Sequence, residues 1–152
     1  MAEPAAQGAT GAVVDPYRNY NFKLEIQGIV EGHFTECSGL GVKVHTVRYR
    51  EAGVAQSVRV LPGAVEYADV ALRYGLTRSR DLWDWLMRTV SGQIERRNLS
   101  ICVLEPDGVT EALRWNLINA FPSQWYGAVF DGLGREAAIE QLTLSFDKLE
   151  RA

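Results

Sequence analysis

The sequence predicts a mainly β protein: an antiparallel β-barrel or sandwich of seven to eight strands, with one α-helix at about residues 79–91. Three observations lead to this fold class. Short runs of alternating apolar and polar residues recur along the chain, turn-forming residues separate them, and a single segment repeats its apolar residues at helical spacing. Strands at regular spacing with turn chemistry between them are typical of antiparallel barrels and sandwiches.

The chain has 152 residues, the usual size of one domain. Hydrophobic residues make up 47% of it, and a chain this long typically buries roughly 70% of its unfolded-state surface, so a core forms without disulfides or metal. We expect a flexible N-terminal arm at residues 1–16 and one domain at residues 17–152. Cys37 and Cys102 lack a partner at metal-ligand spacing, so we expect both to be reduced.

The first strand is predicted from Tyr20, where apolar and polar residues begin to alternate, up to Gly28. A short strand at 33–37 follows, and then a bend at 38–41. Residues 42–50 predict a longer strand with polar and apolar residues on both faces. We expect such a strand where one face meets a core and the other meets a wet cavity or a neighbouring subunit.

A return strand at 57–61 ends at Pro62-Gly63, so residues 42–61 predict an extended, projecting hairpin. The next strand spans residues 67–74 and directs Val70, Leu72 and Tyr74 inward.

The period then changes to that of a helix. The residues with helical spacing are Leu82, Trp85, Leu86, Thr89 and Val90. Ser79 is placed to cap the start of this helix, and Gly92 lies just past its end. Trp83 and Trp85 are two positions apart and therefore face different sides, so we expect one in the core and one on a neighbouring element.

The second half of the chain predicts strands only. Residues 98–104 and 112–118, joined by a turn at 105–108, predict a hairpin. Its inward residues are Leu99, Ile101 and Val103 opposite Leu113, Trp115 and Leu117. A weaker strand at 124–130, a turn at 131–134 and a last strand at 138–146 complete the chain.

No pattern of a catalytic or metal site is present in the sequence. His33 and His45 have no flanking ligands at metal-site spacing. The segment Ser38-Gly39-Leu40-Gly41 lacks the pattern of a nucleophile elbow or a phosphate loop. We therefore expect no enzyme activity, cofactor or metal. The N-terminus has neither a basic region nor an apolar run of a signal peptide, so we expect synthesis in the cytoplasm without a membrane anchor.

The charge is distributed unevenly although the net charge is only −3. Residues 1–42 carry −3, residues 43–97 carry +4 and residues 98–152 carry −4. Thirteen of the sixteen cationic residues are Arg, which suits planar contacts at protein interfaces. The simplest interpretation of this charge distribution is that the charged residues lie on solvated strand faces. The alternative is that each molecule has a basic side and an acidic side, and that the basic side of one copy meets the acidic side of the next.

Open sheet edges recruit other chains unless they are covered, charged or closed. If the edge strands of several copies pair around an axis, the copies form one large barrel whose polar second face lines a wet hole. If identical rings then stack through head-to-tail contacts, they grow into a filament.

The sequence also resembles a known family over about residues 15–150: the tail tube protein of contractile phages, which also supplies the inner tube of phage-derived contractile injection systems. The segments that carry the resemblance are 15–22 (DPYRNYNF), 34–40 (FTECSGL), 47–51 (VRYRE), 61–63 (LPG), 73–77 (RYGLT), 81–85 (DLWDW), 114–116 (RWN) and 119–123 (NAFPS). The haemolysin-coregulated protein of type VI secretion is a distant structural relative. The resemblance implies hexameric rings of β-barrel subunits, stacked into a hollow tube inside a contractile sheath.

The function expected from these observations is mechanical. Copies of the chain assemble with sheath, baseplate and tube-terminator proteins into a tail or injection particle, and the tube conducts cargo protein or DNA and pierces a target envelope. We expect ring or subunit contacts in the hairpin from Val47 to Val60, and lumen or interface positions on other strand faces. The contact residues are Arg48, Arg50, Glu51 and Arg59, and the lumen or interface residues are Lys43, His45, Asp69 and Arg73.

Three other interpretations fit the sequence. The chain could form the initiator or adaptor ring of the tube at the baseplate. It could also be a small monomeric β-barrel that binds a ligand, or an uncharacterised hydrolase. A virus tail that carries DNA and an injection machine that carries protein are equally compatible with the tube.

Overall fold

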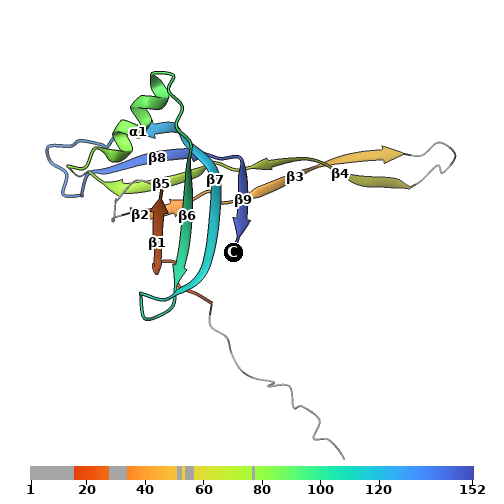
Figure 1. The fold of residues 1–152 in the computed structure, drawn as a ribbon, viewed down its shortest axis with the longest axis horizontal. Helices are drawn as coiled ribbons and strands as arrows, with labels where there is room; N and C mark the ends of the chain where they lie inside the picture. The colour runs from red at the N-terminus through yellow and green to blue at the C-terminus, as the bar shows by residue number, and fades with distance from the viewer. Residues whose placement is uncertain (1–15, 28–33, 51–52, 54–56, 77) are drawn as a thin grey trace, which may run out of the picture.

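A computed structural model describes residues 16–27, 34–50, 53, 57–76 and 78–152 of the chain. These residues form nine strands and one helix (Figure 1). The elements are β1 (Phe22–Ile26), β2 (Phe34–Ser38), β3 (Val42–Arg50), β4 (Val58–Tyr67), β5 (Val70–Gly75), α1 (Asp81–Val90), β6 (Arg97–Leu104), β7 (Glu111–Tyr126), β8 (Ile139–Ser145) and β9 (Lys148–Arg151). The predicted N-terminal arm, apart from Pro16, and His33 lie outside the described residues. No helix in the described ranges is long and apolar enough to cross a membrane.

All strand pairs are antiparallel, and one long strand joins two layers. Strands β1, β6 and β9 form one layer with the first part of β7, and β8, β5 and β2 form the other with its last part. Strands β1 and β2 end the path of paired strands and β9 pairs only with β7, so among the described strands of the body β1, β2 and β9 each have one unpaired edge (Figure 1). The mainly β prediction is confirmed, with nine strands in place of seven or eight.

Strand β7 corrects one sequence prediction. The two separate strands predicted at 112–118 and 124–130 are a single strand of 16 residues that ends at Tyr126. It bends at Asn119, whose φ of 57° is tolerated by Asn better than by most residues. The Asn98 side chain accepts the Asn119 N–H at 3.1 Å, and Arg96 donates to the Asn119 carbonyl at 3.2 Å. These bonds fix the corner at which the strand changes layer.

The predicted hairpin of β6 and β7 is confirmed in its register. Leu99 pairs with Leu117, Ile101 with Trp115 and Val103 with Leu113. Strand β9 was not predicted from the sequence, because its four residues are too few to show an alternating pattern.

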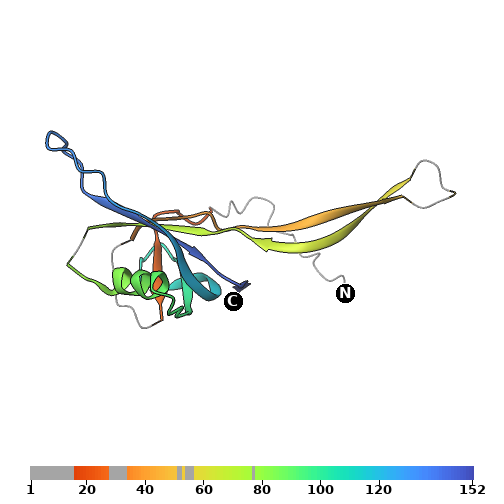
Figure 2. The ribbon, with the colours of Figure 1, turned by 90° about the horizontal axis from the view of Figure 1, so that it is seen from above.

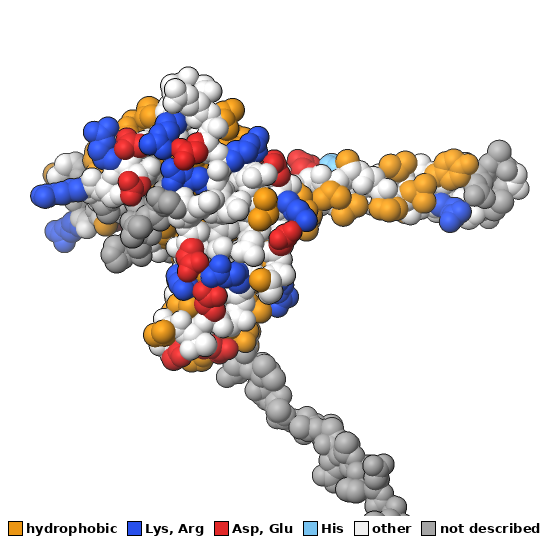
Figure 3. All heavy atoms as spheres, viewed as in Figure 1, with side chains coloured by type: hydrophobic (Ala, Val, Ile, Leu, Met, Phe, Trp, Pro, Cys, Tyr) orange, Lys and Arg blue, Asp and Glu red, His pale blue; other side chains and the backbone are white. Residues whose placement is uncertain are grey.

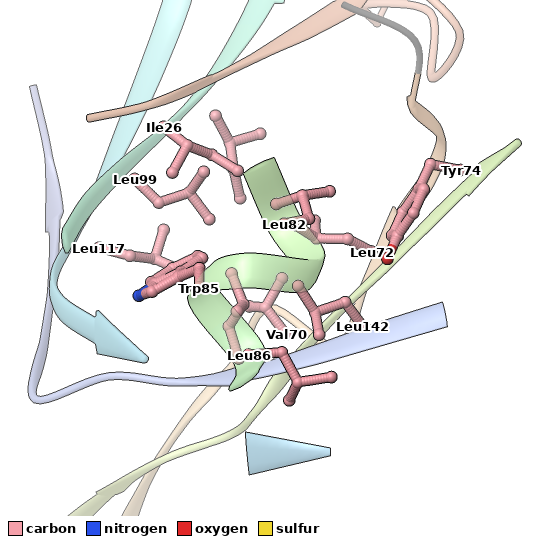
Figure 4. Close-up of a cluster of buried hydrophobic side chains, with 12 residues drawn as sticks. Ile26, Val70, Leu72, Tyr74, Leu82, Trp85, Leu86, Leu99, Leu117 and Leu142 are labelled. Atoms are coloured by element: carbon pink, nitrogen blue, oxygen red, sulfur yellow. The ribbon is translucent and has the colours of Figure 1, made fainter. Parts of the chain in front are cut away.

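The core lies between the two layers and under α1 (Figure 4). Trp85 of the helix is fully buried, and its indole N–H donates to the Glu95 carbonyl at 2.7 Å. Trp83 packs edge-on against Trp125 with ring centroids 5.1 Å apart, so one Trp is in the core and one is on a neighbouring strand, as predicted. The other members of the cluster are Ile26, Val70, Leu72, Tyr74, Leu82, Leu86, Leu99, Ile101, Leu117, Leu142 and Leu144. Because these side chains fill the interior, the alternative of a barrel with an internal ligand is not favoured.

Two details of the helix differ from the prediction. The N-cap residue is Arg80, and it makes no side-chain capping bond, so the prediction of Ser79 as the cap was wrong. Asp81 and Asp84 in the first turn favour the helix start through its dipole instead. Val90 was counted with the apolar face, but it is 70% exposed because it ends the helix. Gly92 follows the helix with φ of 88°, as predicted.

Strand β4 does not end at Pro62-Gly63 as predicted, but continues to Tyr67. The pairing with β3 shifts between Val44 and Thr46, which leaves an extra residue in β4 and forms a bulge there. A Cβ on Gly63 would lie 2.9 Å from the His45 carbonyl oxygen, so the strands approach this closely only because residue 63 is Gly. Pro62 is tolerated because this two-stranded ladder has only edge strands.

Gly39 sets the bend between β2 and β3, where the hairpin leaves the body. Its φ is 89°, and an added Cβ would collide with the Asp69 carbonyl oxygen. Gly108 has a similar φ of 74° in the β6–β7 turn, but a Cβ there would meet nothing within 4 Å. The two glycines therefore separate the effect of a collision from that of backbone strain.

We expect Gly39→Ala to destabilise the fold by about 2–4 kcal/mol, since strain and collision add. Gly108→Ala, with strain alone, should cost only about 1–2 kcal/mol. Each kcal/mol lowers the Tm of a chain of this size by about 2–4 °C, which thermal unfolding followed by circular dichroism can measure. Equal Tm values for the two variants would contradict the role of the close contact at Asp69.

Candidate assembly interface

Strands β3 and β4 form a two-stranded hairpin, which we call the projecting hairpin. It extends away from the body of the molecule in two perpendicular views (Figures 1 and 2). Every residue of β3 is exposed, and β4 buries none of its residues. Within the part of the chain that the structure describes, no element covers either face of the projecting hairpin.

Apolar side chains follow the projecting hairpin along its length (Figure 3). They are Val42, Val44, Val47, Tyr49, Val58, Val60, Leu61 and Val65, all between 41% and 57% exposed. Completing the burial of each would contribute about 1 kcal/mol, and an isolated two-stranded hairpin is only marginally stable in water. Exposed apolar surface of this extent typically marks an interaction site. The hairpin is therefore built to be covered by another protein surface.

The outer half of the projecting hairpin combines these apolar residues with arginines. Residues paired across an antiparallel ladder point to the same face. Arg48 pairs with Val60 and Arg50 with Val58 on one face, whereas Arg59 pairs with Tyr49 on the other. Each face thus presents apolar surface beside a guanidinium group. Glu51, the fourth predicted contact residue, lies outside the described residues.

The four predicted lumen or interface residues fall into two groups. Lys43 and His45 lie at the base of the projecting hairpin, where His45 Nε2 is 2.8 Å from Glu66 Oε2. Asp69 and Arg73 lie on the body instead. Asp69 accepts a hydrogen bond from the Ser145 hydroxyl at 2.8 Å, and Arg73 lies 3.4 Å from Glu36. The structure does not bring these two groups together into one cluster.

Asp69 and Arg73 share the outer face of the layer formed by β2, β5, β8 and the end of β7. Positions 71 and 73 of β5 alternate with the buried Val70, Leu72 and Tyr74 and therefore point outward. The β5–β8 ladder pairs Arg73 with Gln141. We call this the polar sheet face; its members are Glu36, Ser38, Asp69, Ala71, Arg73, Gln124, Tyr126, Ile139, Gln141, Thr143 and Ser145. Small or uncharged side chains predominate, and the Glu36–Arg73 pair is internally neutral.

The two sheet edges face a groove that the sequence alone did not reveal. A cavity of about 630 Å³ lies between β1 and β2. It is lined by Tyr20, Phe22, Phe34, Cys37, Ile101 and Val103, among others. Asn19, Thr35, Glu36 and Ser38 complete the lining, so the groove is part apolar and part polar, and open edges beside it can accept a strand of another chain. The separate apolar runs gave no signal for this site, because it forms only when β1 and β2 meet in the fold.

Two cysteines and one carboxylate cluster are the described groups closest to a reactive or metal-binding site. Burial raises the pKa of the Cys37 thiol to about 11 and also raises the pKa of Cys102. Glu25, Cys102 and Glu111 place possible metal ligands within 4.8 Å of one another. Both carboxylates, however, form ion pairs with Lys23 and Arg114 at 2.8–3.1 Å. This cluster holds strands together and is not suited to a metal ion.

The same cluster gives the stability of the fold a pH dependence. Hydrogen bonds from Arg114 and Lys23 lower the pKa of Glu111 to about 2 from its ordinary value of 4.5. Ionised Glu111 therefore stabilises the fold above pH 4.5, and this contribution disappears as the pH falls from 4.5 to about 2.

We expect Glu111→Gln to flatten the dependence of Tm on pH between about pH 4.5 and pH 2, since the variant has no carboxylate to protonate. Thermal unfolding at a series of pH values measures this effect. Glu136→Gln, at an exposed position in the β7–β8 connection, is the matched control and should retain the wild-type slope. An unchanged slope in the Glu111 variant would exclude the cluster as its source.

A model of the family described as T4-like virus tail tube protein gp19 matches residues 18–150. The chain belongs to this tail tube family. The resemblance found in the sequence is thereby confirmed, and the chain is a structural subunit of a tail tube. No curated protein sequence gives a significant match.

Solved structures agree with the tail tube family. The structure is similar to one described as the tube terminating cap of the anti-feeding prophage, with a TM-score of 0.84, 25% identity, and coverage of 98% of this chain and 99% of the other. A sheath–tube complex of an extracellular contractile injection system, PVC, gives a TM-score of 0.81 at 25% identity, with coverage of 92% of this chain and 93% of the other. A structure of the PVC sheath/tube terminator gives a TM-score of 0.83 at 26% identity, with coverage of 93% of this chain and 99% of the other.

A more distant likeness concerns the fold alone. Hcp1 from Flavobacterium johnsoniae superposes with a TM-score of 0.53 at 15% identity, covering 86% of this chain and 93% of the other. The tail tube fold predicted from the sequence therefore extends to the Hcp proteins.

Proposed function

We propose that this tail tube protein assembles into hexameric rings that stack into a hollow tube within a contractile sheath. Residues 17–152 form the single ring-building domain. The observation that carries the proposal is the projecting hairpin, an element that the other described residues leave uncovered on both faces. A neighbouring copy of the same chain covers the projecting hairpin of each copy, except in the copies at the ends of a tube.

The projecting hairpin supplies the contacts between copies. Arg48, Arg50, Glu51 and Arg59 add charged contacts to its apolar surface; the Arg side chain favours planar pairing with carboxylates across an interface. The register supports contacts on both sides, because Arg48 and Arg50 face one way and Arg59 the other. One face is then available to a neighbour in the same ring and the other to the next ring.

Pairing of sheet edges closes each ring. Strands β1 and β2 end the path of paired strands and flank the groove of about 630 Å³, so a neighbouring strand has hydrogen-bonding edges and a groove of mixed polarity to occupy. Closure around an axis removes the exposed edges, which otherwise promote uncontrolled association.

The polar sheet face lines the lumen. Most of its side chains are uncharged and its Glu36–Arg73 pair is neutral, so it presents no strong field of one sign that would hold a protein or DNA cargo. Asp69 and Arg73 belong to this surface, and Lys43 and His45 lie where the projecting hairpin joins the body.

The protein acts mechanically and not as a catalyst. Sheath, baseplate and tube-terminator proteins bind the outside and the ends of the tube, and sheath shortening drives the tube through a target envelope. The similarity to proteins of sheath–tube and sheath/tube-terminator assemblies supports these partners. The ion-paired or protonated state of the described reactive groups supports a role without chemistry.

We expect Val60→Asp to abolish tube formation while the subunit still folds. Val60 is 53% exposed in the subunit, so the substitution disturbs no core contact. In the assembled tube the carboxylate would be buried, at a cost of about 3 kcal/mol per contact and about a hundredfold in association. Light scattering and negative-stain imaging measure assembly, and circular dichroism measures folding.

Val109→Asp is the matched control, because Val109 is 80% exposed in the β6–β7 turn, away from the projecting hairpin. The control should form tubes like the wild type. Normal tubes from Val60→Asp would exclude the projecting hairpin as the contact between copies. A wild-type chain that remains monomeric would exclude the tube itself.

A further inference from the structure

A second uncovered apolar surface lies in the connection between β7 and β8, residues 127–138, which we call the tip loop. Val129 is 89% exposed, Phe130 78% and Leu133 94%. These fractions exceed those of every apolar residue named on the projecting hairpin. Three adjacent apolar side chains in water are costly, so the tip loop also requires a partner surface.

Hydrogen bonds at Asp131 give the tip loop a defined shape. The Asp131 carbonyl accepts the Gly134 N–H at 3.0 Å, and its carboxylate accepts the Leu133 N–H at 3.0 Å. At the base of the loop, a Cβ on Gly127 would lie only 2.9 Å from the Trp125 ring. Residues 131–134 therefore form a hydrogen-bonded turn, and the side chains of Val129, Phe130 and Leu133 are exposed beside it.

The tip loop lies at the opposite end of the molecule from the projecting hairpin. Both perpendicular views show the β7–β8 connection beyond one end of the sheet and the projecting hairpin beyond the other (Figures 1 and 2). A contact between two different surfaces at opposite ends of one chain is heterologous, so it propagates from copy to copy without capping itself.

We propose that the tip loop of one copy packs against the projecting hairpin of a copy in the next ring of the tube. This inference rests on the proposed tube, and it names the surface that meets the projecting hairpin between rings. Both surfaces are apolar, and each copy supplies one of each, so the contact is satisfied throughout a tube and vacant only at its two ends. The chain thus carries both halves of its own stacking contact.

The test is the double variant Phe130→Ser and Leu133→Ser. Rings should form as in the wild type, because ring closure uses other surfaces, whereas tube length in negative-stain images should fall by about tenfold or more. Val109→Ser removes an equally exposed apolar side chain elsewhere and should leave tube length unchanged. Tubes of normal length from the double variant would overturn this inference and leave the tube intact; a wild-type chain without tubes would overturn the proposed function.

A cross-linking measurement covers the case in which the double variant does not fold. Leu133→Cys is combined with a second cysteine at Val47, Val58, Val60 or Leu61, one pair at a time, because a disulfide forms only when the two Cα atoms approach to about 4–7 Å. We expect a ladder of oxidised oligomers in the tube fraction for at least one pair. The single variants and the pair Leu133→Cys with Val109→Cys are the controls. Absence of a ladder for all four pairs would also overturn the contact.

Discussion

The proposed assembly depends on one physical constraint: the chain builds a two-stranded hairpin with eight exposed apolar side chains, and none of the other described elements covers them. A hairpin of this kind is only marginally stable alone, so in the proposed tube contacts with other copies stabilise and bury it. Ring closure, stacking and tube growth all follow from meeting that requirement repeatedly. The same requirement explains why a single domain with a complete core still presents so much apolar surface.

The body of the molecule holds the projecting hairpin in a fixed direction. Trp85 and the leucines of both layers fill the interior, and the corner at Asn119 lets one strand serve both layers. Gly39 permits the close approach to the Asp69 carbonyl at the point where the hairpin leaves the body. Rigidity of the body matters because a contact that propagates through a long tube must repeat with the same geometry in every copy.

Much of the fold could be predicted from the sequence, because alternation and helical spacing report directly which side chains face the core. The bounds of β3, the register of β6 against β7 and the burial of Leu72 and Trp85 followed in this way. The errors arose where one local signal has two meanings: Pro62-Gly63 is a bulge inside a strand and not its end, and Asn119 is a corner and not a break. The polar sheet face and the β1–β2 groove depend on distant segments meeting, so periodicity could not indicate them. The tip loop is local, but the apolar residues at 129–130 gave the signal of a strand that in the structure ends at Tyr126.

Negative-stain electron microscopy of the purified chain tests the central claim most directly, because one image reports the ring, the hole and the stacking together. The account predicts hollow tubes of stacked rings, with the hairpins hidden inside the wall. A uniform population of single, separate subunits at high protein concentration would contradict it, since the apolar hairpin would then be stable in water without a partner.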